Sequence, residues 1–111
     1  MARVTRGRRK LPTDEQVERT VALFAALANP LRLRLLLVLS RKGAMSAGAL
    51  QEAVGVEQSA VSHQLAALRR GRLVAVERDG RHMIYHLLDE HVAHIVEDAI
   101  KHANERETGD L

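Results

Sequence analysis

Cysteine and tryptophan are absent from the 111 residues of the chain, which contains only one phenylalanine and one tyrosine. Without cysteine there can be no disulfide, no thiolate metal site and no cysteine nucleophile, and the reducing cytoplasm is the expected compartment. Because aromatic side chains are so few, the core of the expected single domain must consist of leucine, valine, isoleucine and alanine. A second copy of the chain would help to stabilise so small a core.

The sequence also has no long uninterrupted apolar run. The leucine-rich stretch 31–39 is too short to span a bilayer and includes Arg32 and Arg34, and no signal peptide precedes it. We therefore expect a soluble, cytoplasmic protein with no membrane partner. Seventeen lysines and arginines outnumber fourteen aspartates and glutamates, which gives a net charge of +3. This modest excess is compatible with a polyanionic partner.

The stretch 55–71, GVEQSAVSHQLAALRRG, has a helical pattern with two different faces. Val61, Leu65 and Leu68 recur at i, i+4 and i+7, so they share one face and can pack on a core. The opposite face is small, polar and basic, and it holds Ser59, Ser62, His63, Ala66, Ala67 and Arg70. A helix that enters the major groove of DNA, about 12 Å wide, needs such short hydrogen-bonding groups to reach base edges.

A second, shorter helix is predicted just before this stretch, over residues 46–54, and Gly55 supplies a tight turn between the two. The pair forms a helix-turn-helix. Taken alone, the helix over 59–70 could equally be an ordinary amphipathic surface helix. The residues that follow it therefore decide between the two interpretations.

After this helix the apolar pattern changes from helical to alternating. The runs 73–78 and 82–87 predict two strands, and Asp79-Gly80 between them is a strong hairpin-turn signal. Arg78 and Arg81 flank the turn. A hairpin with a basic tip, placed directly after a recognition helix, is the wing of a winged helix-turn-helix and would lie along the DNA backbone or reach the minor groove. A hairpin that only packs on the core would leave the basic tip unexplained.

Two further helices are predicted before the helix-turn-helix. Thr13 and Gln16 form a capping box that begins the first helix. Its apolar positions keep helical spacing: Val17, Val21, Phe24, Leu27 and Ala28. Asn29-Pro30 ends this helix and begins the next, with Asn29 as N-cap and Pro30 at the first helical position. The second helix should run to about Arg41, and because it is apolar over much of its circumference it should be the central buried helix.

Residues 89–105 predict a last helix with one buried face. Its apolar stripe consists of Val92, Ile95, Val96, Ala99, Ile100 and Ala103. Glu97 and Lys101 have the i, i+4 spacing of a favourable pair on the outer side. His91 and His102 are eleven residues apart, about three turns, and therefore project on nearly the same side.

Two carboxylates accompany these histidines. Asp89 precedes His91 at the helix start, and Glu105 lies one turn beyond His102, which makes a set of good ligands for zinc or a similar divalent ion. The two histidines are separated by about 16 Å along the helix axis, too far for one ion. Only a second helix running antiparallel could complete a site, which implies a two-fold dimer with two equivalent sites. Histidines on an exposed helix are, however, often merely solvated, and His82, His86 and His94 are interpreted as surface or strand residues.

Three segments together carry a resemblance to a known family. ALANPLRLRLL (26–36), EQSAVSHQLAALR (57–69) and RDGRHMIYHL (78–87) make the chain similar to the ArsR/SmtB family of bacterial metal-sensing repressors, over roughly residues 17–105. The resemblance implies a mainly α fold with a small β-hairpin, a winged helix-turn-helix that forms a homodimer. Residues 1–12 would then be a flexible basic N-terminal arm, which either contacts phosphates or is merely solvated, and residues 106–111 a C-terminal tail on the domain 13–105.

The resemblance also implies a ligand set. D-x-H followed by H-x-x-E resembles the family's site on the C-terminal helix and carries over to Asp89, His91, His102 and Glu105. Members with this site release DNA when they bind zinc, and related members respond to cobalt or nickel. The cysteines of arsenic, cadmium and lead sensors, near residues 46–53, are absent, as are the extra histidines of nickel sensors, and four ligands favour tetrahedral zinc.

The expected protein is thus a repressor that binds double-stranded operator DNA as a homodimer. Binding Zn(II), or Co(II) or Ni(II), would release it and derepress genes for metal efflux or sequestration. The candidate DNA-contacting residues are Gln58, Ser59, Ser62, His63, Arg70, Arg78 and Arg81.

Two other classes of function are weighed against this one. An enzyme is not expected, because four protein ligands leave no open position for water and the chain has no nucleophile motif, phosphate loop or H-E-x-x-H sequence. The alternative that stays open is a DNA-binding regulator of the same family whose inducer is not a metal, or which senses nothing.

Overall fold

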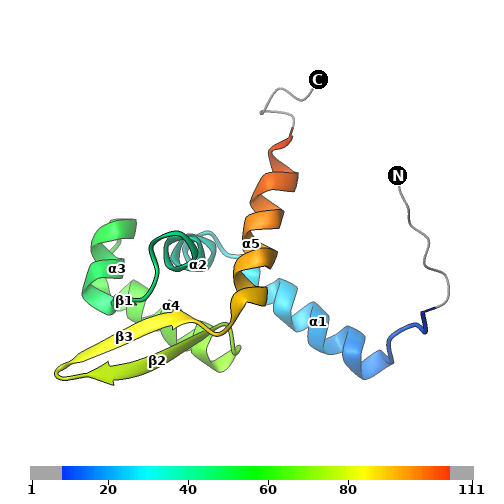
Figure 1. Ribbon diagram of the computed structural model, residues 1–111, viewed down its shortest axis with the longest axis horizontal. Coiled ribbons are helices and arrows are strands. Elements are labelled where there is room, and N and C mark those ends of the chain that lie inside the picture. The colour runs from blue at the N-terminus through cyan, green and yellow to red at the C-terminus, as the bar shows by residue number, and fades with distance from the viewer. Residues whose placement is uncertain (1–8, 106–111) are drawn as a thin grey trace.

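The computed structural model describes residues 9–105, in which five helices and three strands follow one another (Figure 1). The elements are, in chain order, α1 (Asp14–Leu27), α2 (Pro30–Lys42), β1 (Met45–Ser46), α3 (Ala47–Val54), α4 (Gln58–Arg70), β2 (Val74–Asp79), β3 (His82–Leu87) and α5 (Glu90–Ala103). The predicted arm, apart from residues 9–12, and the predicted tail lie outside the described residues. The predicted fold class, a mainly helical winged helix-turn-helix with a small antiparallel sheet, is confirmed.

Both predicted helix starts near the N-terminus are confirmed by their caps. The Thr13 hydroxyl accepts from the backbone N–H of Gln16 at 3.1 Å, and Thr13 N–H donates to the Gln16 side chain at 2.9 Å, which completes the capping box. Asn29 caps α2 by accepting from the N–H of Arg32 at 2.9 Å. α1 and α2 meet at a bend of 91°. No single helix within residues 9–105 is long and apolar enough to cross a membrane, and only this bent pair taken together reaches the length and composition needed.

The core lies around α2, as predicted from a sequence that is apolar over much of the circumference of this helix. This helix packs against α3, α4, α5 and β3. The fully or nearly fully buried side chains are Leu35, Leu36, Leu39, Leu50, Val61, Leu65, Leu68, Leu73, Val74, Val92 and Val96. All are leucine or valine, so the core of the described residues has no buried aromatic side chain, as the composition requires.

The sheet has three strands in the order β1-β3-β2, all antiparallel. The short strand β1 is not anticipated by the sequence, because two residues cannot show an alternating pattern. The predicted turn is wrong by one residue: Asp79 pairs with His82, so the two-residue loop is Gly80-Arg81. Gly80 has a φ of 65°, the left-handed conformation that a hairpin turn with glycine at its first central position requires.

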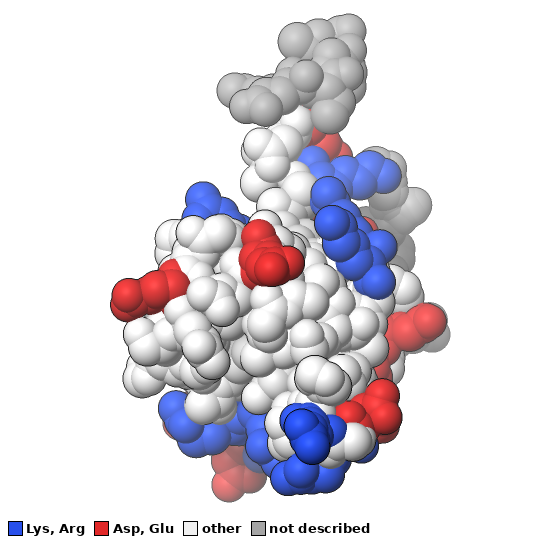
Figure 2. Space-filling view, turned by 90° about the vertical axis from the view of Figure 1, so that its left-hand side faces the viewer, with Lys and Arg blue, Asp and Glu red and all other residues white. Residues whose placement is uncertain are grey.

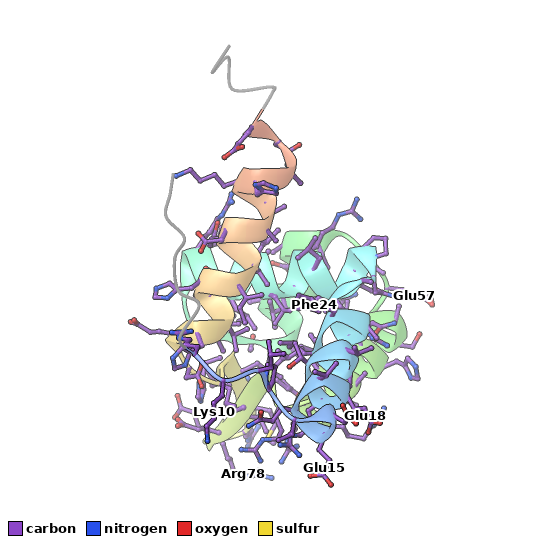
Figure 3. All side chains as sticks on the ribbon, turned by 90° about the vertical axis from the view of Figure 1, so that its right-hand side faces the viewer. Lys10, Glu15, Glu18, Phe24, Glu57 and Arg78 are labelled. Carbon is purple, nitrogen blue, oxygen red and sulfur yellow. The ribbon has the colours of Figure 1, made fainter. Side chains whose placement is uncertain are left out.

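α1 extends away from the body of the molecule and has no buried residue (Figure 1). Three of its apolar side chains, Val17, Val21 and Phe24, are 46%, 59% and 59% exposed. Figure 3 shows the side of the molecule on which α1 and α5 face the viewer, and Phe24 is labelled there. Grouped exposed apolar side chains mark an interaction surface.

α5 departs from its prediction in two respects. Its apolar stripe is buried only at Val92 and Val96, whereas Ala99 and Ala103 are exposed, because the second half of the helix rises above the body (Figure 1). The predicted Glu97 pair with Lys101 is wrong. The Glu97 carboxylate instead accepts hydrogen bonds from residues at the end of α2, from Arg41 Nη2 at 2.9 Å, Arg41 Nε at 3.0 Å and Ser40 Oγ at 2.9 Å.

Candidate nucleic-acid interface and candidate metal ligands

Local caps and one glycine set the angle between α3 and α4. The Ser46 hydroxyl accepts from the N–H of Ala49 at 3.1 Å and begins α3, and Gly55 ends it with a left-handed φ of 69°. Glu57 stands at the N-cap of α4 without capping it by its side chain, and its carboxylate accepts from the Ser59 hydroxyl at 3.1 Å. The helix-turn-helix predicted from the glycine turn is confirmed.

The two faces predicted for α4 are found. Val61, Leu65 and Leu68 are at most 1% exposed and pack into the core. The candidate DNA-contacting residues of this helix, Gln58, Ser59, Ser62, His63 and Arg70, are all exposed. Ala67, placed on the outer face by the sequence pattern, is half-buried instead. The outer face thus carries short polar groups with no bulky apolar side chain among them.

A groove of about 420 Å³ runs between the second half of α4 and β3. Its lining residues are Ser62, Leu65, Ala66, Arg69, Arg70 and Tyr85. Arg69 and Tyr85 were not among the sequence candidates. Arg69 could have been found from its place beside Arg70 in the last turn of α4, but Tyr85 reaches this groove only through the hairpin packing.

The hairpin presents the two predicted arginines at different depths. Arg81 occupies the turn itself, and Arg78 pairs with Met83 one step behind it. Both arginines are exposed. Figure 2 shows Lys and Arg side chains gathered along the lower edge of the molecule, where Figure 1 places the hairpin and α4. One edge therefore combines the polar helix face with positive charge.

The four candidate metal ligands form two pairs at opposite ends of α5. Asp89 is the N-cap residue, and its Oδ1 accepts from the N–H of His91 at 2.9 Å and of Val92 at 3.3 Å. His91 Nδ1 lies 3.4 Å from the same oxygen, and at the other end His102 Nδ1 lies 3.9 Å from Glu105 Oε1. The two imidazole side chains are 89% and 87% exposed.

Each pair offers one imidazole and one carboxylate, which are donors that zinc accepts. Within residues 9–105 of one chain, no group of three or more His, Cys, Asp or Glu side chains could hold an ion. About 16 Å of helix separates the two histidines, so the two pairs of one chain cannot hold the same ion. A four-ligand zinc site at either end would therefore need two further donors from a second chain.

The remaining histidines do not extend either pair. His63, His82 and His94 are exposed. His86 is half-buried on β3, where its Nδ1 lies 2.9 Å from the carbonyl oxygen of Leu87 and its Nε2 lies 3.7 Å from Glu77. The interpretation of His82, His86 and His94 as surface or strand residues agrees with these positions, and His63 is the candidate DNA contact on α4.

A helix-turn-helix followed by a basic hairpin, with polar groups on the outer face of its second helix, defines a winged helix-turn-helix DNA-binding protein. Comparison with known proteins gives the same class: residues 27–77 match a family model described as a helix-turn-helix domain. The chain is 45% identical over 105 residues to the HTH-type transcriptional regulator NmtR of Mycobacterium tuberculosis, which covers 94% of this chain and 87% of that protein.

Solved structures are similar to the chain as well, and two of them are described below. The AntR antimony-specific transcriptional repressor superposes with a TM-score of 0.81 at 36% identity, covering 91% of each chain. The homodimeric winged helix-turn-helix DNA-binding domain of Mb0332 from Mycobacterium bovis has a TM-score of 0.76 at 28% identity, covering 87% of this chain and 92% of that one. The chain belongs to the ArsR/SmtB family of winged helix-turn-helix transcriptional regulators. It is a DNA-binding regulator and not an enzyme.

Proposed function

We propose that the chain is a metal-responsive repressor that binds operator DNA as a homodimer in the cytoplasm and is released on binding Zn(II), with Co(II) or Ni(II) as the alternative inducers. Release would derepress genes for metal efflux or sequestration. One observation supports the proposal: α5 holds two exposed His–carboxylate pairs at its opposite ends, each of which would supply two of the four ligands of a tetrahedral zinc site.

The homodimer is supported by the apolar face of α1. Val17, Val21 and Phe24 are too exposed to stabilise a lone chain, and a symmetric partner would bury them. Mb0332 is described as homodimeric. In an antiparallel pair of α5 helices, Asp89 and His91 of one subunit would meet His102 and Glu105 of the other, and the two-fold axis would generate a second, identical site.

The DNA contacts proposed for α4 follow from side-chain chemistry. Gln58, Ser59, Ser62 and His63 have short donors and acceptors that can address base edges in the major groove. Arg70, Arg78 and Arg81 would neutralise phosphates beside it. Arg69 and Tyr85, which line the same groove as Arg70, extend this surface toward the hairpin.

A regulatory ligand acts only through a difference in its affinity for two states. Four ligands drawn from two subunits would fix the mutual position of the α5 helices. Glu97 of α5 is hydrogen-bonded to the end of α2, and α4 packs on the same core as α2. A change in the position of α5 would therefore also move α4. The spacing of the two recognition helices, which must match major grooves about 34 Å apart, would change accordingly.

The test is a calorimetric titration of zinc into the free dimer and into the dimer on a DNA duplex selected with the protein. We expect zinc to bind more tightly to the free dimer. Equal affinities in the two states would contradict the switch, however tight the site.

A second candidate function is a regulator with a non-metal inducer or none. One observation favours it: Oδ1 of Asp89 already accepts from two backbone N–H groups as the N-cap of α5. Absence of tight zinc, cobalt and nickel binding in both states of the dimer would support this candidate and remove the first.

A further inference from the structure

Arg32, in the first turn of α2, joins three helices through one guanidinium group. Its Nε donates to Oε1 of Gln64 in α4 at 2.7 Å, and its Nη1 donates to the carbonyl oxygen of Ala26 in the last turn of α1 at 3.3 Å. The Asn29 cap fixes its backbone N–H at 2.9 Å. Among residues 9–105, no other side chain hydrogen-bonds both α1 and α4.

α1 has few other attachments to the body. It has no buried residue, although Leu23, Ala26 and Leu27 are partly buried against the core, and Ala28 and Asn29 connect it to α2 across a bend of 91°. Its last turn contains no basic residue. The charge of Arg32 therefore faces the negative end of the α1 helix dipole, which stabilises this arrangement. The direction in which α1 leaves the body therefore depends on these apolar contacts and on the hydrogen bond from Arg32.

Gln64 differs from its neighbours on α4. Ser62 and His63 are exposed, whereas Gln64 is half-buried and its amide oxygen accepts from Arg32. A planar guanidinium presents several donors at fixed angles and can hold two acceptors at once, while the single ammonium of a lysine cannot hold them in this geometry. The chemistry of the contact therefore requires an arginine on α2 and an amide or carboxylate oxygen on α4.

We propose that Arg32 is a positioning residue that sets the angle between α1 and the recognition helix α4, and thereby the half-site spacing that the dimer accepts. This inference rests on the proposed function, in which two chains pair through α1. The two copies of α4 must reach grooves about 34 Å apart, and one base-pair step is about 3.4 Å. A small change in the angle between the two helices therefore moves the dimer out of register with its operator.

The experiment uses the full-length dimer and a palindromic duplex selected from random sequence with the wild-type protein. Further duplexes have the half-sites moved by one or two base pairs, and one duplex holds a single half-site. Gln64→Leu removes the acceptor while Arg32 stays in place. We expect affinity for the selected spacing to fall about tenfold, as for the loss of a hydrogen bond from a charged donor, and affinity for the single half-site to be unchanged. The variant should therefore bind the duplexes with the selected and the shifted half-site spacings with more nearly equal affinity than wild type does.

Three further variants complete the test. Arg32→Lys should flatten the preference in the same way. Gln64→Glu should keep the wild-type preference because it retains the acceptor. Arg34→Lys, on the exposed side of α2, is the matched control.

Lower thermal stability with an unchanged ranking of spacings would mean a merely structural role and would overturn the inference. An equal loss on the single half-site would overturn it too, because Gln64 would then contact DNA. If the wild-type protein itself is monomeric or selects no paired half-sites, the proposed function fails, and this failure is seen before any variant is made.

Discussion

Arg41 and Glu97 are 56 residues apart in the chain, yet the guanidinium of Arg41 donates from both Nη2 and Nε to the Glu97 carboxylate, at 2.9 and 3.0 Å. The pair ties the middle of α5 to the last turn of α2. The hydrogen bonds from Arg41, and then that from Ser40, lower the pKa of Glu97, and the Glu97 hydrogen bond raises the pKa of Arg41. The helix that carries the candidate metal ligands is thereby joined to the core.

The first prediction is a pH dependence that follows from this pair. A carboxylate with a lowered folded-state pKa contributes stability above its ordinary pKa, and that contribution is lost as the pH falls through the folded-state value. The melting temperature of wild type should therefore exceed that of Glu97→Gln near neutral pH, and the difference should disappear on acidification below the ordinary glutamate range. Scanning calorimetry over a pH series measures this. Glu52→Gln, on the exposed side of α3, is the control. If the difference in melting temperature between wild type and Glu97→Gln did not vary with pH, that result would count against the ionic contact.

The second prediction concerns the proposed reading face of α4. Ser62→Ala and His63→Ala should each weaken binding to the selected operator by about 1 to 3 kcal/mol if the side chain contacts a base, while binding to unrelated DNA stays the same. Because both residues are exposed, the helical circular dichroism signal of the variants should match wild type. Unaltered footprints on the selected duplex would mean that another element reads the sequence.

The third prediction concerns the hairpin. Arg78→Ala and Arg81→Ala should weaken specific and non-specific DNA binding alike, because both arginines are expected to bind phosphates. The slope of log affinity against log salt should become shallower by about 0.9 for each phosphate that the variant no longer neutralises. Arg19→Ala, on α1, is the matched control and should leave the slope as it is. The same slope in the hairpin variants as in wild type would remove the hairpin from the interface.

The fourth prediction tests α1 as the dimerisation helix. Burying a phenylalanine contributes about 1.5 to 3 kcal/mol, and a dimer would bury two copies of Phe24. Because Phe24 is 59% exposed in one chain, only that part of its burial is gained on dimerisation, and Phe24→Ala should weaken dimerisation by about tenfold to a few hundredfold. The chain should stay folded, since α1 contributes no buried residue to the core. Sedimentation equilibrium gives the dissociation constant, and Arg19→Ala again serves as control. A wild-type dissociation constant for Phe24→Ala would place the dimer contact elsewhere.

Local sequence signals predicted most of the fold. The Thr13 capping box, the Asn29-Pro30 junction and the Gly55 turn each fix backbone hydrogen bonds within a few residues of themselves, and each is found at its predicted position. The 3.6-residue period likewise identified the buried and exposed faces of α4, since that period depends only on helix geometry.

The errors arose where distant parts of the chain decide the outcome. Spacing favoured Lys101 as the partner of Glu97, but α2 brings Arg41 to the same carboxylate, and no local pattern reports that contact. The turn shifted by one residue because Gly80 can supply its positive φ from either central position of a hairpin loop. The four candidate metal ligands stay a prediction, because a site shared by two chains would depend on contacts between chains that the structure of one chain does not contain.

The last prediction tests whether each metal site is shared between chains. In the proposed geometry one site takes Asp89 and His91 from one subunit and His102 and Glu105 from the other. Homodimers of His91→Ala and of His102→Ala would each keep three ligands per site and should bind zinc poorly. In a heterodimer of the two variants, one site collects both alanines and the other has all four ligands. Mixing the variants and allowing the subunits to exchange should therefore restore one tight zinc per heterodimer.

The same mixture distinguishes the alternative. If the ligands of one site came from a single chain, every chain would still lack one histidine, and mixing would restore nothing. Helix geometry already opposes this, because about 16 Å between the histidines cannot be closed by rotamer changes while α5 remains a helix. A mixture of isotope-labelled and unlabelled His91→Ala is the control for exchange itself. We expect the mixture to recover one tightly bound ion per heterodimer, with partial release from operator DNA. If mass spectrometry shows that the heterodimer is present and zinc binding nevertheless stays weak, the shared site is excluded.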